Sequence, residues 1–260
     1  MKIYIHTDLE GITGVLRADQ VPTDGPEYRQ SCENLMADLN AAVAGAFDGG
    51  ADQVTVLDSH GGKGENFLLD LLDGRAVNDT KPNGKWWGIL DGSYDGTMFI
   101  GAHAMAGTIN GFLDHTQCGL TWYNYSLNGR RFGELAQWAT VAGHFGVPML
   151  MVCGDQAACA EARAFFNPID SAAVKQGLGR NRATGYPPEE ARAKIREAAK
   201  RAISLVGAAQ PFRPIFPAEV KLKTTRADFA DEMAQRWPDA ERLDARTLRR
   251  VVADGLDILF

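Results

Sequence analysis

The hydrophobic pattern of the first hundred residues combines strand-like runs with one helical period. Residues 3–7 alternate bulky side chains in a way that is typical of a β-strand, and similar runs follow at residues 52–57 and 97–100. Between the first two runs, apolar residues recur at helical spacing over residues 28–46, and Gly49-Gly50 end the predicted helix. A strand–helix–strand unit makes a parallel pair of strands, so the pattern predicts an α/β fold.

The rest of the chain continues with similar elements. An aromatic strand over residues 121–127 reaches Asn128-Gly129, which is a hairpin signal. We expect helices over residues 134–145, 156–165, 188–206, 226–236 and 245–254, and strands over residues 149–153, 173–177 and 219–224. The prediction is therefore a three-layer α/β fold with a central, mostly parallel sheet. We expect one domain over residues 1–260, with a smaller C-terminal subdomain over residues 171–260.

Polar residues with metal-ligand chemistry follow each of the first three strands. Asp8 and Glu10 come after the first strand, and His60 follows the second. His103 follows the third, with small residues on both sides. Ligands gather at the carboxyl ends of strands in open α/β sheets, and two ionised carboxylates this close repel each other unless a cation lies between them. The pattern predicts a metal site at this edge of the sheet.

The type of ligand limits the choice of metal. Imidazole and carboxylate groups without a nearby thiolate pair suit zinc, and manganese, iron and cobalt stay open. Two histidines and two acids are more than one catalytic zinc usually takes from a protein. A carboxylate that bridges two ions, roughly 3.5–4 Å apart, would use all four groups. Asp8 is the natural bridge because it is the most central of them.

Five other residues carry weaker signals. Glu134 stands at a helix start, where the helix dipole alone favours a glutamate. His115 lies in a polar loop, either as an exposed side chain or as a mobile general acid or base. His6 fits packing or support of the site, and His144 fits a structural role late in a helix. Cys118 reads as a small buried hydrophobe rather than a nucleophile.

Composition places the chain among ordinary globular proteins. Of its 260 residues, 45% are hydrophobic and 23% are charged. No window approaches the roughly 18 uncharged apolar residues of a membrane span, and the first residues do not resemble a signal peptide. Four cysteines without CxxC spacing favour reduced thiols, so we expect a cytoplasmic protein.

The net charge of −6 is unevenly distributed. Residues 1–170 hold 10 Lys and Arg against 21 Asp and Glu, a net charge of −11, whereas residues 171–226 hold 12 against 4, a net of +8. The acidic part suits cation binding, and the basic part is either a solvated helix face or a surface that meets carboxylates or a partner chain. Its helical basic residues are Arg192, Lys194, Arg196, Lys200 and Arg201. Nucleic-acid binding is not expected, because the overall balance is acidic.

Several motifs resemble those of one known family, the D-aminopeptidase metallopeptidases of dipeptide-transport operons. The matching motifs, in chain order, are Asp8-Leu9-Glu10-Gly11-Ile12-Thr13-Gly14, Asp58-Ser59-His60-Gly61, Gly101-Ala102-His103-Ala104-Met105, Leu113-Asp114-His115-Thr116 and Asn128-Gly129-Arg130-Arg131-Phe132-Gly133-Glu134. They cover most of residues 1–160, and residues 174–180 are similar more loosely. The resemblance implies a two-zinc aminopeptidase that acts on peptides with an N-terminal D-residue and assembles as a ring-like decamer.

The resemblance also implies roles for individual residues. Asp8 would bridge the two zinc ions, with Glu10 and His60 completing one site. His103 and Glu134 would complete the other site, which replaces the simpler interpretation of Glu134. His115 would be the catalytic residue beside them. In a ring, the aromatic hairpin near Trp122, Tyr123 and Tyr125 is one candidate contact between subunits.

The expected function is hydrolysis of the N-terminal residue from short peptides. Two alternatives stay open. One is a two-metal amidase or phosphoesterase on another small substrate, for which only Lys63, Arg130 and Arg131 are candidate phosphate clamps. The Gly61-Gly62-Lys63-Gly64 loop lacks the spacing of a phosphate-binding loop. The other alternative is a non-catalytic protein that binds a metal or a peptide, for which a proton shuttle at His115 would have no use.

Overall fold

Seven strands form the central sheet within residues 1–62 and 65–260, the part of the chain that this computed structural model describes. Their order is β3-β2-β1-β4-β7-β8-β9, and every neighbouring pair is parallel except β8 and β9. The strands are β1 (Lys2–Thr7), β2 (Gln53–Asp58), β3 (Val77–Asp79), β4 (Gly96–Ala102), β7 (Met149–Asp155), β8 (Asp170–Gly179) and β9 (Arg182–Gly185). Their near-continuous apolar runs fit a sheet that is covered on both faces.

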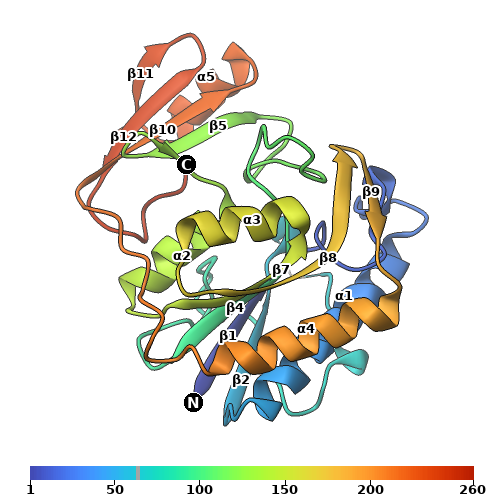
Figure 1. Ribbon diagram of the computed structural model, residues 1–260. Helices are drawn as coiled ribbons and strands as arrows, with labels where there is room; N and C mark the ends of the chain where they lie inside the picture. Colours follow the sequence, from blue (N-terminus) through green and yellow to red (C-terminus); the bar gives the residue numbers. More distant parts are fainter. Residues whose placement is uncertain (63–64) are drawn as a thin grey trace.

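Helices cover both faces of this sheet (Figure 1). On one face, α1 (Tyr28–Asp48) and α4 (Pro188–Ile203) lie side by side and enclose an apolar core with β1, β2 and β4. On the other face, α2 (Glu134–His144) and α3 (Gln156–Phe165) enclose a second core around Trp138 and Phe99. These layers confirm the predicted α/β class with a mostly parallel sheet. Over the described residues, no helix is long and apolar enough to cross a membrane.

A second, antiparallel sheet packs on the outer side of α2 (Figure 1). Its order over the described residues is β11-β12-β10-β5-β6. These strands are β5 (Trp122–Leu127), β6 (Arg130–Arg131), β10 (Ala218–Thr224), β11 (Glu241–Asp244) and β12 (Thr247–Val252), and α5 (Ala227–Arg236) packs on β10 and β12. Because α2 lies between two sheets, it is buried on every side: Trp138 faces the parallel sheet and Val141 faces the second one.

The helix predicted over residues 245–254 is wrong, because this segment contains strand β12. Leu248 and Val252 are four residues apart, a spacing that suits one face of a helix and one face of a strand equally. Pairing of β12 with both β10 and β11 decides the outcome, since it buries both side chains in the core between α2 and the antiparallel sheet. The short strands β3, β9 and β11 had no clear signal in the sequence.

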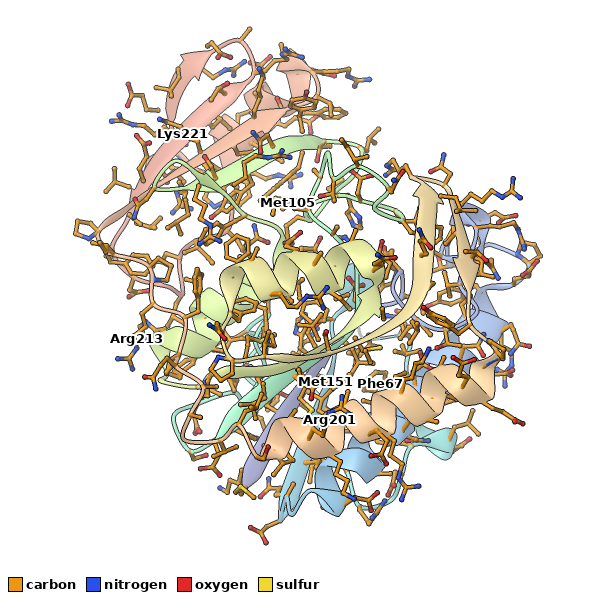
Figure 2. The ribbon with its side chains drawn as sticks, viewed as in Figure 1. Phe67, Met105, Met151, Arg201, Arg213 and Lys221 are labelled. Carbon is orange, nitrogen blue, oxygen red and sulfur yellow. The ribbon has the colours of Figure 1, made fainter. Side chains whose placement is uncertain are left out.

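The basic helix α4 meets carboxylates of the acidic part of the chain. Arg192 Nε lies 3.4 Å from the buried Asp38 Oδ1 of α1, and Arg196 Nε lies 2.7 Å from Asp48 Oδ2. Arg201, on α4 in Figure 2, pairs with Asp170 at 2.9 Å. The charge asymmetry is thus partly balanced inside the fold. Arg196 and Arg201 remain about half exposed, so these two pairs contribute little to stability.

The register of the parallel strands brings three strand ends together. Thr7 at the end of β1 lies opposite Asp58 of β2 and Ile100 of β4. The loop after β1 then crosses the end of β4 in direct backbone contact, with Gly11 N donating to Gly101 O at 2.8 Å. A Cβ on Gly11 would lie 2.1 Å from Ala102 O, so only glycine permits this approach. Residues that follow the three strands must therefore share one small space.

Candidate metal centre and catalytic site

Six predicted site residues meet at the carboxyl ends of β1, β2 and β4. Asp8 and Glu10 lie in the loop after β1, His60 begins a short 3₁₀ turn after β2, and His103 directly follows β4. Glu134 is the first residue of α2, and His115 comes from the loop between β4 and β5. Five of the six line a cavity of about 670 Å³, and His103 lies buried behind them.

Asp8 is the centre of this cluster because its two oxygens face different histidines. Oδ1 lies 2.9 Å from His60 Nδ1, and Oδ2 lies 3.4 Å from His103 Nε2. Glu10 Oε2 lies 3.1 Å from the same His60 nitrogen, and Glu134 Oε1 lies 3.4 Å from His103 Nε2. One carboxylate therefore reaches two groups of ligands, each with an imidazole and a further carboxylate.

His103 shows that the cluster fits a cation. Its Nδ1 donates to the Ala104 carbonyl at 3.1 Å, so in the neutral form of the ring the lone pair lies on Nε2. This Nε2 is buried and has no hydrogen-bond partner within the described part of the chain. It faces oxygens of Asp8 and Glu134, which also only accept when ionised. A histidine held by a backbone carbonyl and facing carboxylates is typical of a metal ligand, and these donors suit zinc.

The ligand atoms form one continuous cluster. Those of Asp8, Glu10 and His103 lie within 4.8 Å of one another, and so do those of His103, His115 and Glu134. His115 Nε2 lies 3.7 Å from Glu134 Oε1 and 3.9 Å from Glu10 Oε1. Its ring stacks on that of His103, with centroids 3.9 Å apart. His115 thus borders the cluster from the cavity side.

The carboxylates control the charge of the histidines in the protein alone. Burial opposes a charge on His60, but Glu10 and Asp8 outweigh burial and raise the pKa of His60 to about 11. Burial also opposes a charge on His103, and Glu134 and Asp8 still raise its pKa. Metals bind neutral imidazole, so metal binding must displace these protons. Metal affinity should therefore fall as the pH falls.

A sequence model of the D-aminopeptidase family matches residues 1–259. The chain belongs to this family. A D-aminopeptidase of Bacillus subtilis (strain 168) is 33% identical over 217 residues, which are 82% of this chain and 78% of that protein. A solved structure, the Zn-dependent D-aminopeptidase DppA from Bacillus subtilis, described as a self-compartmentalizing protease, matches with a TM-score of 0.92 at 29% identity. The match covers 99% of this chain and 94% of that one.

In this member of the D-aminopeptidase family, other buried polar side chains hold the loops of the site. Asp58 accepts hydrogen bonds from the backbone of Asn66 and Phe67, and Asn66 Nδ2 donates to the His60 carbonyl at 2.9 Å. Lys175 of β8 is buried and donates to the carbonyls of Glu10 and Val15. Asp58 therefore supports the loop of His60 rather than lining the cavity, and Lys175 supports the loop of Glu10.

Glu161 of α3 supports the loop after His103. It is buried, and its Oε2 accepts from Met105 N at 2.8 Å (Met105 is labelled in Figure 2). Sequence reasoning missed Glu161, because it lies in the middle of a helix without a neighbouring motif. Lys175 had a signal only in the loose similarity of residues 174–180. A lysine in a predicted buried strand could have indicated a side chain that serves buried carbonyls.

The remaining candidates lie in different surroundings. His6 lines the cavity and packs between Phe99 and Trp138, in agreement with packing or support of the site. Cys118 is partly buried and packs against the core between α2 and the antiparallel sheet. His144 lies in the last turn of α2.

The two arginines among the candidate phosphate clamps lie outside the lining of this cavity. Arg130 stacks on the Phe165 ring at 3.6 Å, and Arg131 donates to Asn124 Oδ1 at 3.0 Å. Lys63, like Gly64, lies outside the described residues. Neither described arginine lines the cavity of the metal cluster, and the phosphoesterase alternative is disfavoured by the family to which the chain belongs.

Proposed function

We propose that this protein is a di-zinc aminopeptidase that removes the N-terminal residue, a D-amino acid, from short peptides. The observation that carries the proposal is the division of the Asp8 carboxylate between two histidines. Asp8, Glu10 and His60 would hold one zinc ion, and Asp8, His103 and Glu134 would hold the other. The names of the matched D-aminopeptidases support zinc and the D-residue.

When bound, zinc lowers the pKa of coordinated water and polarises the carbonyl of the bond to be broken. His115 is positioned to move the proton. Its Nδ1 donates to the Leu113 carbonyl at 2.7 Å, so Nε2 points to the carboxylates and the cavity. As water adds to the carbonyl carbon and the C–N bond breaks, His115 Nε2 would pass a proton to the leaving amine nitrogen. Glu134 is held by the Gln117 backbone N–H at 2.6 Å.

The cavity also offers a place for the free amino group of the peptide. In its neutral form the amino nitrogen would bind one of the proposed zinc ions, or in its ammonium form it would donate to an oxygen of Asp8, Glu10 or Glu134 that the ions leave unused. Recognition of that group would make the enzyme an exopeptidase.

The test combines metal analysis with amide hydrolysis. We expect about two zinc ions per chain and faster release of p-nitroaniline from D-alanine p-nitroanilide than from the L-isomer. The His115→Ala variant should keep its zinc and lose roughly 10²–10⁴-fold in kcat, the usual contribution of general acid–base catalysis. Normal turnover by that variant would refute the role of His115, and less than one zinc per chain would refute the metal scheme.

We further propose a homo-oligomer, a decamer by resemblance, in the cytoplasm. The self-compartmentalizing nature of DppA supports an oligomer, and free cysteines at positions 32, 118, 153 and 159 support a reducing compartment. In the aromatic hairpin, Trp122 and Tyr125 are buried in the core between α2 and the antiparallel sheet, so Tyr123 and the nearby Leu120 remain as exposed contacts. Pairing of β5 with β10 supports one domain over residues 1–260. Native mass spectrometry would give the subunit number directly.

A further inference from the structure

The catalytic cavity has a second kind of lining, which the proposed mechanism does not use. The loop over residues 80–95, between β3 and β4, contributes Lys81, Lys85 and Trp86 to the cavity that Asp8 and Glu10 line. The cavity therefore has carboxylates and imidazoles from the strand ends and two ammonium groups from this loop. A volume of about 670 Å³ is in the range of sites that enclose a small ligand.

Neither ammonium group is neutralised by the protein. Among the described residues, the side-chain lysine ion pairs are those of Lys194 and Lys221, and no carboxylate lies within 4.0 Å of Lys81 or Lys85. Lys85 Nζ lies 5.2 Å from the centroid of the Trp87 ring. The acids that line the cavity face the histidines instead. Two unpaired cations in the cavity of an acidic protein are suited to an anionic part of the ligand.

The backbone at Lys81 has an uncommon conformation that hydrogen bonds to a buried carboxylate stabilise. Lys81 has φ +53°, a left-handed conformation that residues with a side chain seldom adopt and that clusters at functional sites. Asp79, which is buried, stabilises it: Oδ1 accepts from Lys81 N at 2.7 Å, and Oδ2 accepts from Ile89 N at 2.6 Å. The Tyr4 hydroxyl of β1 also donates to Asp79. One buried carboxylate thus fastens both ends of the lysine loop to the central sheet.

We propose that Lys81 and Lys85 bind the C-terminal carboxylate of a dipeptide or tripeptide substrate. This inference rests on the proposed aminopeptidase function. With the first peptide bond at the metal cluster, the C-terminal carboxylate of a short peptide lies one or two residues farther on, at about 3.3–3.6 Å per extended residue. Among the described residues, the lysine and arginine side chains that line this cavity are Lys81 and Lys85, and both could receive it. The enzyme would then prefer peptides that are short enough for their C-terminal carboxylate to reach the two lysines.

The consequence is a preference for free acids over blocked carboxyl ends. D-alanyl-glycine carries the carboxylate, whereas D-alanyl-glycinamide has the same bond to cleave and the same shape without the charge. We expect the wild-type enzyme to cleave the acid with a kcat/KM at least 10-fold above that of the amide, mainly through a lower KM. A hexapeptide acid with the same N-terminus should lose this advantage, because its carboxylate lies beyond the lysines.

The experiment compares the acid-to-amide ratio of kcat/KM between variants of the zinc-loaded enzyme. The Lys81→Ala/Lys85→Ala double variant should bring the ratio close to 1, and Lys81→Arg should retain most of it, since guanidinium also binds carboxylate. Lys200→Ala is the matched control, because Lys200 lies exposed on α4 and does not line the cavity. Its ratio should equal that of the wild type.

The outcomes separate this inference from the function on which it rests. A wild-type ratio near 1, or equal losses on acid and amide in the double variant, would overturn the assignment of the lysines while leaving the aminopeptidase in place. A zinc-loaded wild type that cleaves neither peptide nor D-alanine p-nitroanilide would overturn the proposed function itself.

Discussion

Replacement of Glu161 by glutamine tests the electrostatics that surround the site. Glu161 is 8% exposed, one of its oxygens accepts from Met105 N, and the other has no partner among the described residues. Burial raises the pKa of Glu161 to about 7, although the Met105 hydrogen bond and nearby His103 oppose this shift. Asp155 and Glu134 add to the shift through repulsion. Glutamine has nearly the same shape as glutamate and keeps an oxygen that accepts the hydrogen bond from Met105 N, but it does not ionise.

The magnitude follows from linkage between protonation and folding. The pKa of Glu161 is raised from 4.5 in the unfolded chain to about 7 in the folded protein, so the folded protein binds more protons between these values. The additional proton binding at Glu161 stabilises the folded protein at low pH. The unfolding free energy therefore decreases as the pH rises from 4.5 through about 7. At 1.36 kcal/mol for each pKa unit, the loss amounts to about 3 kcal/mol. Glutamine does not titrate, so the Glu161→Gln variant should not show this loss. The unfolding free energy of the variant minus that of the wild type should therefore increase by about 3 kcal/mol between pH 4.5 and pH 8.

Urea unfolding of both proteins without metal, in the presence of a chelator, measures this difference. His103 and the other acids titrate in both proteins, so their contributions largely cancel in the comparison. Glu197→Gln on α4 is the control, because Glu197 is exposed and its substitution should shift stability equally at both pH values. A difference between Glu161→Gln and wild type that stays constant from pH 4.5 to pH 8 would refute the argument that Glu161 is buried with a shifted pKa.

Two further predictions concern the metal ions. Asp8→Asn should reduce the zinc content from two ions per chain to less than one, whereas Glu10→Gln should keep the ion held by His103. Metal analysis after gel filtration measures both zinc contents. Equal losses in the two variants would argue against Asp8 as the bridge. Zinc removal should lower the melting temperature, and the gain on adding zinc back should be larger at pH 8 than at pH 6, because fewer protons then compete for His60 and His103. A gain that is the same at both pH values in scanning fluorimetry would contradict the proton displacement.

The grouping of the candidate metal ligands was predictable because it depends on the most regular part of the fold. Apolar runs mark β1, β2 and β4, and parallel pairing places their carboxyl ends together. Once Thr7 lies opposite Asp58 and Ile100, the residues that follow have little freedom. Asp8, Glu10, His60 and His103 could thus be grouped from their positions after strands. Glu134 and His115 follow no strand of this sheet, and only the resemblance to a family brought them into the group.

The second sheet was harder to predict because its strands are separated widely in sequence. β5 pairs with β10 almost a hundred residues later, and β12 completes the sheet with side chains whose spacing also fits a helix. Local periodicity cannot decide such a case, whereas burial against α2 does. The predicted helix over residues 245–254 failed for this reason, while α4, whose amphipathic period is long, was predicted within a few residues.

Lys81 and Glu161 were missed for a different physical reason. The position of a residue directly after a buried strand is fixed by the sheet. The position of a loop residue is fixed by the contacts that hold the loop, and these can come from distant parts of the sequence. For Lys81 the contact is with Asp79, to which the Tyr4 hydroxyl donates from a strand 75 positions earlier. The two kinds of side chain that line the cavity therefore come from separate segments, the strand ends and the loop over residues 80–95. Changes in the lysine loop can alter which peptides are accepted while the strand ends, and with them the ligands of the proposed zinc ions, stay as they are.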